Sequence, residues 1–439
     1  MTDIIFSFDT EDFTSNYAAD AIYQEAEIMR QAGITAGFCT VGLLAKQLKN
    51  WGRTDVVEAL RHHQILSHSY GHSLHPTINE YTDREDFFAA YDEAMSQESE
   101  ALELLHDTFG DVKIYGACPP GNSKSYVAMY AYADLGLPLY ADTVCDTPTG
   151  TGAFYCNIFH VQYCLAFEQM FRMTDEEIRA ALDKLATRKR AIIFTHPNIA
   201  LYEKHWDAVN YMKVNSHPFG QWEEPPRRSP EEVARFFETM RKVVGWIKAD
   251  PRFRIISYSQ LAEKVEQEAP RVITREEIPA LRAAIDKEFA PVTMPHSYSL
   301  ADLFLAAKDL LSGKESHLCG KVYGFLQTPF AISAPVRLKK EDILASANTF
   351  SVEKFLPTEI WVGGQKIGPG DWLRAALAVL CGEEEILLTP APQMPSLDPL
   401  PDARDCRLLG WVHSDEYKDE YLSDRLRLQA WTMRFAPEI

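Results

Sequence analysis

Residues 4–12 read IIFSFDTED, an apolar and aromatic run that ends abruptly in acidic residues. A short run of this kind, bounded by charge, predicts a buried β-strand over residues 4–8 that ends at Asp9. A helical pattern follows over residues 18–33 and closes at Gly33, a residue typical of helix ends. The start of the chain is therefore expected to form a strand followed directly by a helix.

The same alternation of strand and helix continues as far as residue 258. Further strands are predicted over residues 34–41, 65–68, 112–117, 137–142, 190–196 and 253–258. Helices are predicted over residues 54–63, 83–109, 124–136, 174–188 and 230–248. This alternation indicates an α/β fold in which helices cover parallel strands. We expect a distorted (β/α) barrel of about seven parallel strands.

Four residues with reactive side chains lie at or just beyond the ends of predicted strands. They are Asp9, His68, Cys118 and His196. In a parallel barrel all carboxyl ends of the strands open onto one face, where the loops that follow them build active sites. These four residues are therefore expected to converge although they are far apart in the sequence.

The composition is that of an ordinary folded globular protein: the 439 residues are 46% hydrophobic and 24% charged. The length fits one large domain and a smaller one. We expect the barrel over residues 1–267 and a smaller, mostly helical or α+β domain over residues 268–439. The formal net charge of −19 argues against binding to nucleic acid or to anionic membrane surfaces. The sequence is compatible with either a monomer or a homo-oligomer.

The first residues, MTDIIFSFDTED, contain no basic region, no long apolar run and no small-residue cleavage site. They do not resemble a signal peptide. No apolar stretch approaches the length of a membrane span. The eight cysteines include no CxxC pair and do not form a disulfide framework in a chain of this length. The sequence therefore predicts a reduced, cytoplasmic protein.

Two segments of the C-terminal part, residues 298–311 and 367–380, echo each other. Each places a small residue three positions before an aspartate and then continues as an apolar helical stripe. Ser299 and Gly368 suit the N-cap positions of two helices. Two helices with similar caps explain the echo, and a duplicated half-domain is the alternative interpretation.

The segment SHSYGHSLHP at residues 67–76 contains three histidines. His68 and His72 have an HxxxH spacing that lets two imidazoles reach one metal ion. Zinc accepts imidazole and carboxylate ligands, and catalytic zinc keeps three protein ligands plus water. A histidine-rich loop without metal is the alternative interpretation. His75 precedes Pro76, and a packing role in the loop is expected for it.

Asp9, Glu11 and Asp12 provide three acids at the end of the first predicted strand. They could form a solvated loop or a helix cap. A metal-dependent hydrolase, however, needs one carboxylate as a metal ligand and another as a proton acceptor. Acids two or three positions apart can divide these two tasks.

Residues 1 to about 265 resemble the polysaccharide deacetylases of carbohydrate esterase family four, and the resemblance rests on four motifs in the family's order. FSFDTED is similar to the first motif, which implies that Asp9 is the general base and that Glu11 or Asp12 binds the metal. HSYGH matches the second motif, H-[ST]-x-x-H, and implies that His68 and His72 are metal ligands.

CPPGNS at residues 118–123 is similar to the third motif, but Cys118 stands where the family has an arginine. In the family this guanidinium pairs with the base aspartate. Another cation could replace it, and the candidates are Arg227, Arg228 and Lys124. Alternatively, the base works with a raised pKa, or the site binds metal and ligand with poor turnover. Cys118 itself could also be a nucleophile or a zinc ligand.

FTHP at residues 194–197 is similar to the family's last motif, in which a histidine at a strand end protonates the leaving amine. The resemblance assigns this role to His196 and implies a zinc ion, or another divalent metal, as cofactor. It implies a zinc-dependent hydrolase of a linear amide bond in an N-acetylated sugar or glycan. The alternative is an impaired carbohydrate-binding or scaffold protein that keeps the metal. The expected substrate-binding residues are Tyr70, Cys118, Pro119, Pro120, Gly121 and Trp206.

Overall fold

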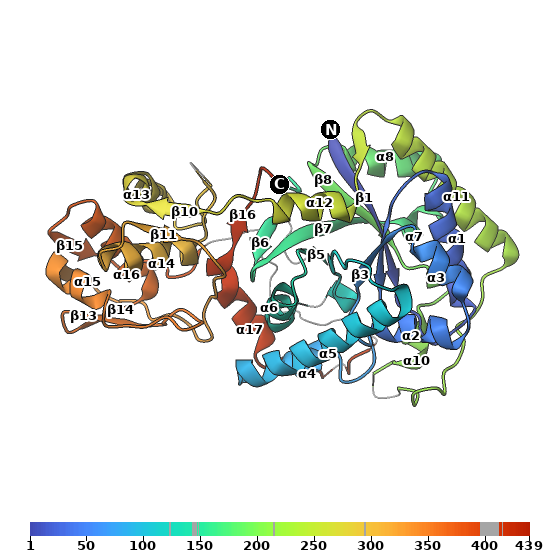
Figure 1. Ribbon diagram of the computed structural model, residues 1–439, viewed down its shortest axis with the longest axis horizontal. Coiled ribbons are helices and arrows are strands. Elements are labelled where there is room, and N and C mark those ends of the chain that lie inside the picture. The colour runs from blue at the N-terminus through green and yellow to red at the C-terminus, as the bar shows by residue number, and fades with distance from the viewer. Residues whose placement is uncertain are drawn as a thin grey trace.

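A computed structural model describes residues 1–122, 124–142, 147, 149–213, 216–293, 296–395, 412–414 and 416–439. Seven parallel strands form a closed ring in its N-terminal part (Figure 1). In ring order they are β1 Thr2–Thr10, β2 Gly37–Thr40, β3 Gln64–Ser67, β4 Gly116–Ala117, β5 Leu139–Asp142, β7 Ile158–Ala166 and β8 Arg190–Thr195. Strand β8 pairs with both β7 and β1 and so closes the ring. The predicted (β/α) barrel is confirmed.

The membership of the ring differs from the prediction in one strand. The segment expected as a strand over residues 253–258 forms only the short β9, Phe253–Ile255, which pairs with the start of β1 outside the ring. Its place in the ring is taken by β7, which was not predicted. Strand β7 reads IFHVQYCLA, a mostly apolar run in which His160 and Gln162 are the two polar interruptions.

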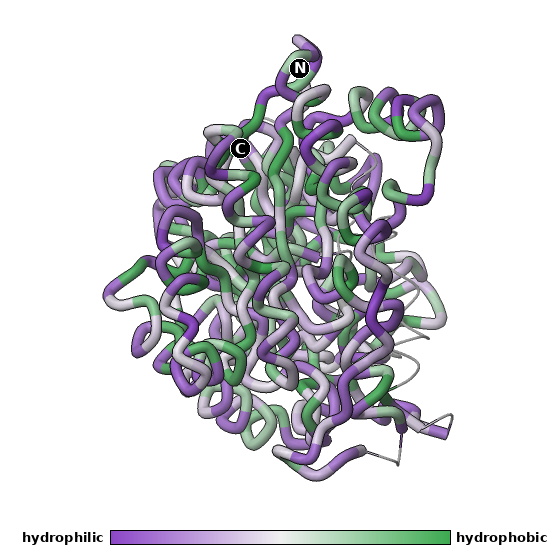
Figure 2. Tube along the Cα trace, turned by 90° about the vertical axis from the view of Figure 1, so that its right-hand side faces the viewer, coloured by the Kyte–Doolittle hydropathy of each residue, from purple (hydrophilic) through white to green (hydrophobic). Residues whose placement is uncertain are grey.

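Most of the helices lie around the barrel. Their bounds are α1 Ala18–Gln31, α2 Gly42–Asn50, α3 Thr54–Leu60, α4 Ile78–Thr82, α5 Phe87–Phe109, α6 Tyr126–Asp134, α7 Phe167–Met170, α8 Asp175–Leu185, α9 Asn198–Leu201, α10 Trp206–Asn210, α11 Pro230–Ala249 and α12 Tyr258–Glu266. Figure 2 shows hydrophobic and hydrophilic residues alternating along the outer helices, the pattern of amphipathic helices that cover a core. No helix in the described part of the chain is both long and apolar enough to span a bilayer.

The two faces of β1 explain how the barrel positions Asp9. Successive side chains of a strand point to opposite sides. Ile4, Phe6 and Phe8 belong to the main core cluster, which the helices share, whereas Ile5 lies in a separate cluster with residues of the neighbouring strands. Asp9 has the same parity as Ile5 and is buried. It therefore lies on the inner side of the ring at its carboxyl end.

The second unit has its own hydrophobic core, in which Phe304 and Trp372 are fully buried. Its helices are α13 Ile278–Lys287, α14 Leu300–Leu311, α15 Lys340–Ser346 and α16 Pro369–Leu380. Its strands are β10 Val272–Thr274, β11 Ser316–Leu318, β12 Val336–Lys339, β13 Ile360–Val362, β14 Gln365–Ile367 and β15 Glu385–Leu388. This α+β content agrees with the expectation, and the unit lies beside the barrel in Figure 1.

The second unit repeats one order of elements. Antiparallel strands β10 and β11 enclose α13 and α14, while antiparallel β12 and β15 enclose α15 and α16. Helices α14 and α16 begin after Ser299 and Gly368, the predicted N-caps. Ser299 Oγ accepts from the amide of Asp302 at 3.0 Å, and Asp371 accepts from the amide of Gly368 at 3.3 Å. The second set also contains the β13–β14 hairpin between α15 and α16, which has no counterpart between α13 and α14, so the duplicated half-domain stays an alternative interpretation.

The last residues of the chain return to the barrel. Helix α17, Leu422–Leu428, contributes two leucines to the core of the barrel. Strand β16, Arg434–Phe435, pairs antiparallel with β6, Ala153–Tyr155, which in turn pairs with β7. The short 3₁₀ segments are Pro120–Asn122, Arg275–Glu277 and Gln429–Thr432. The boundary expected at residues 267 and 268 stays a prediction. Residues 422–439 contact both units, because Leu422 and Leu426 lie in the core of the barrel whereas Leu428 and Trp431 lie in the core of the second unit.

Candidate metal centre

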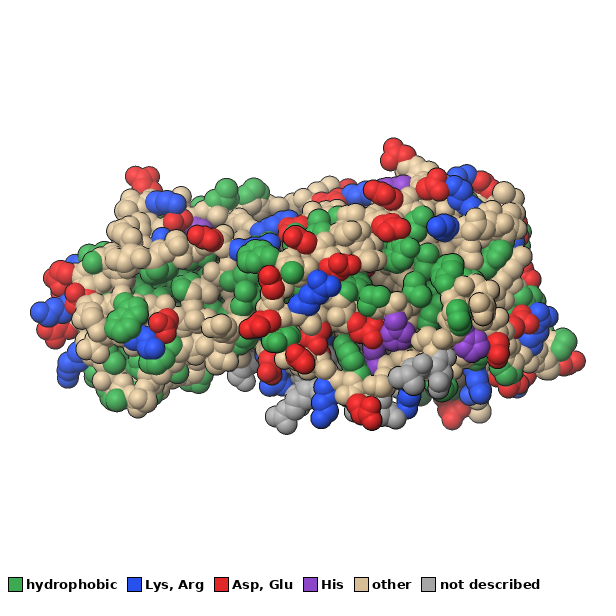
Figure 3. Space-filling model, turned by 90° about the horizontal axis from the view of Figure 1, so that it is seen from below, with side chains coloured by type: hydrophobic (Ala, Val, Ile, Leu, Met, Phe, Trp, Pro, Cys, Tyr) green, Lys and Arg blue, Asp and Glu red, His purple; other side chains and the backbone are tan. Residues whose placement is uncertain are grey.

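A polar pocket of about 270 Å³ lies at the carboxyl end of the barrel. The face drawn in Figure 3 carries histidine side chains next to acidic ones over the barrel. The residues that line the pocket are Asp9, Glu11, His68, His72, Pro119, Gly121, Tyr163, Ala166, Glu168, Gln169, Phe194, His196, His205 and Asp207. The expected convergence of strand ends is thus observed: Asp9, His68 and His196 line the pocket, and Cys118 Sγ lies 3.6 Å from Asp9 Oδ1.

Glu11, His68 and His72 form one compact group of possible metal ligands. Glu11 Oε2 lies 2.9 Å from His72 Nε2 and 3.6 Å from His68 Nε2. Two N or O ligands on one tetrahedral zinc ion, each about 2.0–2.1 Å from the metal, are separated by roughly 3.3 Å. The observed distances lie on either side of this value. All three side chains are buried, so the group is shielded from bulk water.

Hydrogen bonds fix the orientation of both imidazoles. His68 Nδ1 donates to the carbonyl oxygen of Cys118 at 2.6 Å. His72 Nδ1 donates to Ser73 Oγ at 2.7 Å, and this hydroxyl donates to Asp207 Oδ2 at 2.7 Å. Because each Nδ1 is a donor, Nε2 of each ring points toward Glu11, and it would offer its lone pair to a metal ion once its proton is displaced. Outer partners of this kind are typical of histidines that bind metals.

Charge around these histidines supports the fit of a cation. Burial alone would lower the pKa of His68, but Glu11 and Asp9 outweigh it and raise that pKa to about 9. Burial would raise the pKa of Glu11, yet His72 and His196 hold it well below the ordinary value. His68 Nε2 is buried and has no hydrogen-bond partner among the described residues. An N, N, O donor set with such an unpaired nitrogen fits a divalent ion such as zinc.

The two acids that follow Asp9 occupy different environments. Asp12 Oδ1 accepts from the amide and hydroxyl of Thr14 at 2.9 and 2.7 Å. Burial raises the pKa of Asp12 to about 7. The structure therefore brings Glu11 to the two histidines, whereas Asp12 belongs to neither group of possible ligands within the described residues.

Asp9 and His196 form a pair beside the possible metal ligands. Asp9 Oδ1 accepts from the hydroxyl of Tyr163 at 2.7 Å, and Asp9 Oδ2 lies 3.7 Å from His196 Nε2. His196 Nδ1 lies 2.9 Å from Glu168 Oε1. Burial would lower the pKa of His196, but the negative charges of Glu168, Glu11 and Asp9 raise it well above the ordinary value. The pair thus combines a proton acceptor with a protonated imidazole.

We expect Glu168→Gln to lower the pKa of His196, because the amide keeps a hydrogen-bonding oxygen and removes the negative charge. The imidazolium would then lose its proton at a lower pH than in the wild type. The measurement is an NMR titration of the His196 ring in the metal-free protein. Glu80→Gln, which alters the carboxylate that contacts His75 at 2.8 Å, serves as the control and should leave this titration unchanged. An unaltered His196 titration in Glu168→Gln would contradict the conclusion that Glu168 raises the pKa of His196.

No arginine or lysine lines the pocket within the part of the chain that the structure describes. Arg227 pairs with Glu224 at 2.8 Å, and Arg228 lies 3.6 Å from Glu232. The expectation that Arg227, Arg228 or Lys124 replaces the missing guanidinium is therefore not met by the residues that line the pocket.

Two neutral side chains lie beside Asp9 where a cation was expected. Tyr163 donates to Asp9, and Cys118 Sγ lies 2.8 Å from the Tyr163 hydroxyl and 3.6 Å from Asp9 Oδ1. Burial raises the pKa of the Cys118 thiol well above its ordinary value, so without a metal the thiol is neutral. The carboxylate of Asp9 thus has hydrogen-bond support without a fixed positive charge from these two residues.

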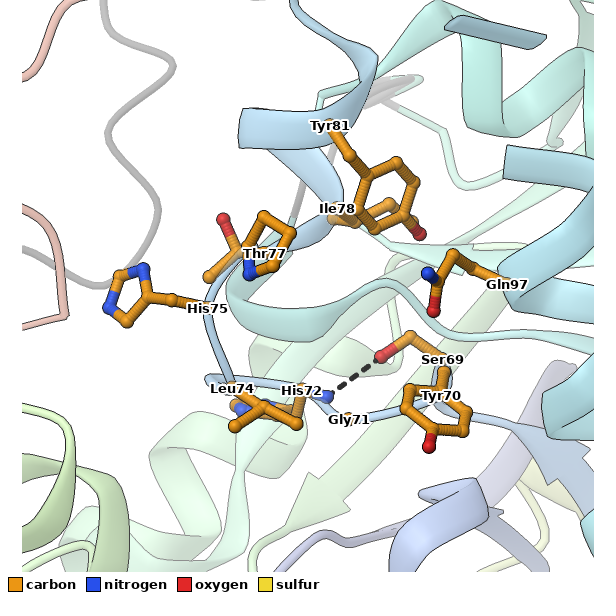
Figure 4. Close-up of a pocket in the computed structure, with 11 residues that line it drawn as sticks. Ser69, Tyr70, Gly71, His72, Leu74, His75, Thr77, Ile78, Tyr81 and Gln97 are labelled. Carbon is orange, nitrogen blue, oxygen red and sulfur yellow. Dashed lines mark hydrogen bonds between the residues drawn. The ribbon is translucent and has the colours of Figure 1, made fainter. Parts of the chain in front are cut away.

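The six expected substrate-binding residues separate into three groups. Pro119 and Gly121 line the metal pocket, while Cys118 and Pro120 are not part of its lining. Tyr70 lines a separate pocket of about 120 Å³ behind the loop of His68 and His72 (Figure 4). In that loop Ser69 Oγ accepts from the amide of His72 at 3.1 Å.

Trp206, the sixth expected substrate-binding residue, is not part of the pocket lining. Its side chain is fully buried, with 0% of its surface exposed, so its ring face cannot stack on a sugar. Instead Trp206 Nε1 donates to Glu11 Oε1 at 3.1 Å. Trp206 therefore fixes the carboxylate that faces the two histidines.

Four lining residues with titratable side chains were not predicted from the sequence: Tyr163, Glu168, His205 and Asp207. Tyr163 lies near the end of β7 and Glu168 follows that strand. Both would have been candidates if β7 had been predicted, because they occupy the same strand-end position as the other site residues. His205 and Asp207 lie at the start of α10, and His205 Nδ1 lies 3.7 Å from Glu11 Oε1.

No protein-family model and no curated protein matches the chain. Solved structures share part of the fold with low overall similarity. A protein from Mycobacterium smegmatis with a provisional description as a polysaccharide deacetylase is 16% identical, with a TM-score of 0.39 over 60% of this chain and 90% of its own. A 4-α-glucanotransferase from Thermococcus litoralis is 10% identical, with a TM-score of 0.39 over 62% of this chain and 41% of its own. A pseudoenzyme of carbohydrate esterase family four from Bacillus anthracis is 11% identical, with a TM-score of 0.34 over 60% of this chain and 65% of its own.

Proposed function

We propose that the chain is a metal-dependent hydrolase of a linear amide bond, and that it removes the acetyl group of an N-acetylated sugar or glycan. One observation carries the proposal. The buried group of Glu11, His68 and His72 lies in the same pocket as the pair of Asp9 and His196. This arrangement combines a metal-binding set with an unligated proton acceptor and a protonated imidazole, the components of metal-assisted hydrolysis.

The roles of the residues follow from their contacts. A divalent ion such as zinc, held by Glu11, His68 and His72, would polarise the amide carbonyl and acidify water. Asp9 is the general base, and Tyr163 orients its carboxylate through a 2.7 Å hydrogen bond. His196 is the general acid that protonates the departing amine, because Glu168 keeps its imidazole charged.

The pocket supports a small polar substrate. Its volume of about 270 Å³ lies just below the ~300–1,000 Å³ that is usual for drug-sized ligands, so it suits one sugar unit or its acetamide group. Pro119, Gly121 and Phe194 supply apolar or small lining next to the charged groups. Backbone amides of the loop at Pro119 and Gly121 are candidates to hold the developing oxyanion.

A second candidate function is favoured by the environment of Asp9. The neutral hydroxyl of Tyr163 and the neutral thiol of Cys118 contact its carboxylate where a guanidinium would fix a positive charge. A barrel with this site could retain a metal ion and a carbohydrate ligand with little or no turnover. The two candidates differ in chemistry and not in fold.

Acetate release by the zinc-loaded full-length chain tests the proposal. Acetylated chitooligosaccharides and simple acetamides are the probes, and ligand binding is followed in parallel by calorimetry. We expect release of acetate that depends on zinc and is lost after treatment with a chelator. Binding of chitooligosaccharides without any acetate release, in protein with one equivalent of zinc, would favour the second candidate and overturn the first.

A further inference from the structure

A second group of possible ligands lies next to the first and contains sulfur. The carboxylate of Asp9, the imidazole of His68 and the thiol of Cys118 each offer one atom, and these atoms lie within 4.8 Å of one another. All three side chains are buried. His68 belongs to both groups, so the two groups share one imidazole.

The distance between the sulfur and a carboxylate oxygen of this group suits a tetrahedral ion. Zinc–sulfur bonds are about 2.3 Å long and zinc–carboxylate bonds about 2.0 Å, which places two such ligands roughly 3.5 Å apart. Cys118 Sγ and Asp9 Oδ1 are 3.6 Å apart. The two atoms can therefore bind one ion with little movement of either side chain.

His68 offers this group the same imidazole that it offers to Glu11 and His72, so an ion at either position would use it. Its side chain is 1% exposed, and its Nε2 has no hydrogen-bond partner among the described residues. A buried polar atom without a partner is costly, and a bound cation removes that cost. The carbonyl oxygen of Cys118 accepts from His68 Nδ1 at 2.6 Å, so the residue that offers the sulfur also orients the imidazole.

We propose that Cys118 is a metal ligand, and that Asp9, His68 and Cys118 bind a thiophilic divalent cation at a position distinct from that of Glu11, His68 and His72. On binding, the S–H bond of Cys118 breaks, a metal–sulfur bond forms, and the proton is released to solvent. Soft thiolate ligands favour ions such as zinc, cadmium and cobalt over magnesium and manganese. The inference shares His68 with the proposed function but does not depend on turnover.

Occupation of this position has a consequence for the proposed reaction. When Asp9 is a ligand, its carboxylate is no longer free to accept a proton from water. A cation bound by Asp9, His68 and Cys118 would therefore prevent Asp9 from acting as the general base, although every residue of the pocket stays in place. The same pocket would then hold an active and an inactive arrangement of metal.

Near-ultraviolet absorption of the full chain loaded with one equivalent of Co²⁺ or Cd²⁺ tests the inference, because only a thiolate ligand gives a sulfur-to-metal charge-transfer band. The exposed Cys381 is replaced by serine in every variant, so that it does not contribute. We expect the band in this background and its loss in Cys118→Ser. We also expect the affinity for cadmium to fall by roughly 100-fold or more in Cys118→Ser, since even loss of an outer partner of a ligand costs 10–100-fold.

Two further variants make the outcome decisive. Cys39→Ser alters a second buried cysteine, 3.7 Å from the Tyr163 hydroxyl and outside the ligand group, and should keep the band. His72→Ala removes a ligand of the other group only and should also keep it. Absence of the band with one bound equivalent of metal would overturn the inference, as would its survival in Cys118→Ser or its loss in His72→Ala. None of these measurements depends on enzymatic activity, so they remain valid even if the protein does not deacetylate any substrate.

Discussion

Replacing His68 with alanine is expected to remove nearly all bound zinc from the protein. His68 is the one residue that belongs to both groups of possible ligands found among the described residues, so neither of these three-ligand sets survives its loss. We expect the affinity for zinc to fall by more than roughly 100-fold, beyond the 10–100-fold that loss of an outer partner costs. The measurement combines elemental analysis of the purified protein with calorimetric titration of zinc into the metal-free form.

His75→Ala is the matched control, because it changes a histidine of the same loop. His75 Nδ1 contacts Glu80 at 2.8 and 2.9 Å and does not line the metal pocket. This variant should keep one equivalent of zinc. Full zinc content in His68→Ala, in a protein with an unchanged circular dichroism spectrum, would contradict the candidate centre and with it both proposals.

The barrel could be predicted because its strands carry a strong local signal. Strand β1 is buried along its whole length, and such strands read as apolar runs that alternate with amphipathic helices. Once the strands are parallel, the positions of Asp9, His68 and His196 at their carboxyl ends imply convergence without any knowledge of contacts. The part of the site that follows from topology was therefore accessible from the sequence.

The sequence contains a further signal, the alternation of side chains along a strand, that distinguishes Glu11 from Asp12. Successive side chains of a strand point to opposite faces, so Glu11 shares the face of Asp9 and Asp12 does not. Strand β1 continues to Thr10, which carries this alternation to the edge of the pocket. The two-residue periodicity of a β-strand alone therefore favours Glu11 as the acid that lies next to the histidines.

Other features of the site depend on contacts that no local pattern reveals. Glu168 and His196 are 28 residues apart, and their 2.9 Å contact exists only because β7 and β8 pair side by side. Tyr163 and Asp9 meet across the barrel from positions 154 residues apart. Because β7 was not predicted as a strand, Tyr163 and Glu168, which it positions, were not predicted as site residues.

Asp9→Asn is expected to lower kcat/KM for acetamide hydrolysis by about 100- to 10,000-fold, the usual contribution of a general base. Asparagine has nearly the same shape, and its amide oxygen can still accept the hydrogen bond of Tyr163. The substitution removes the proton acceptor, while Glu11, His68 and His72 remain to hold the metal. The measurement is acetate release at saturating zinc, with the zinc content determined on the same sample.

A comparison with Asp12→Asn separates the role of Asp9 from a general effect of removing a buried acid. Asp12 is as buried as Asp9, but its hydrogen bonds run to Thr14 and its side chain does not line the pocket. Asp12→Asn should therefore keep its zinc and most of its activity. Loss of zinc in Asp12→Asn would make Asp12 the metal ligand in place of Glu11. Equal activity in Asp9→Asn and the wild type would show that Asp9 is not the base, since no amide can accept a proton in its place at neutral pH.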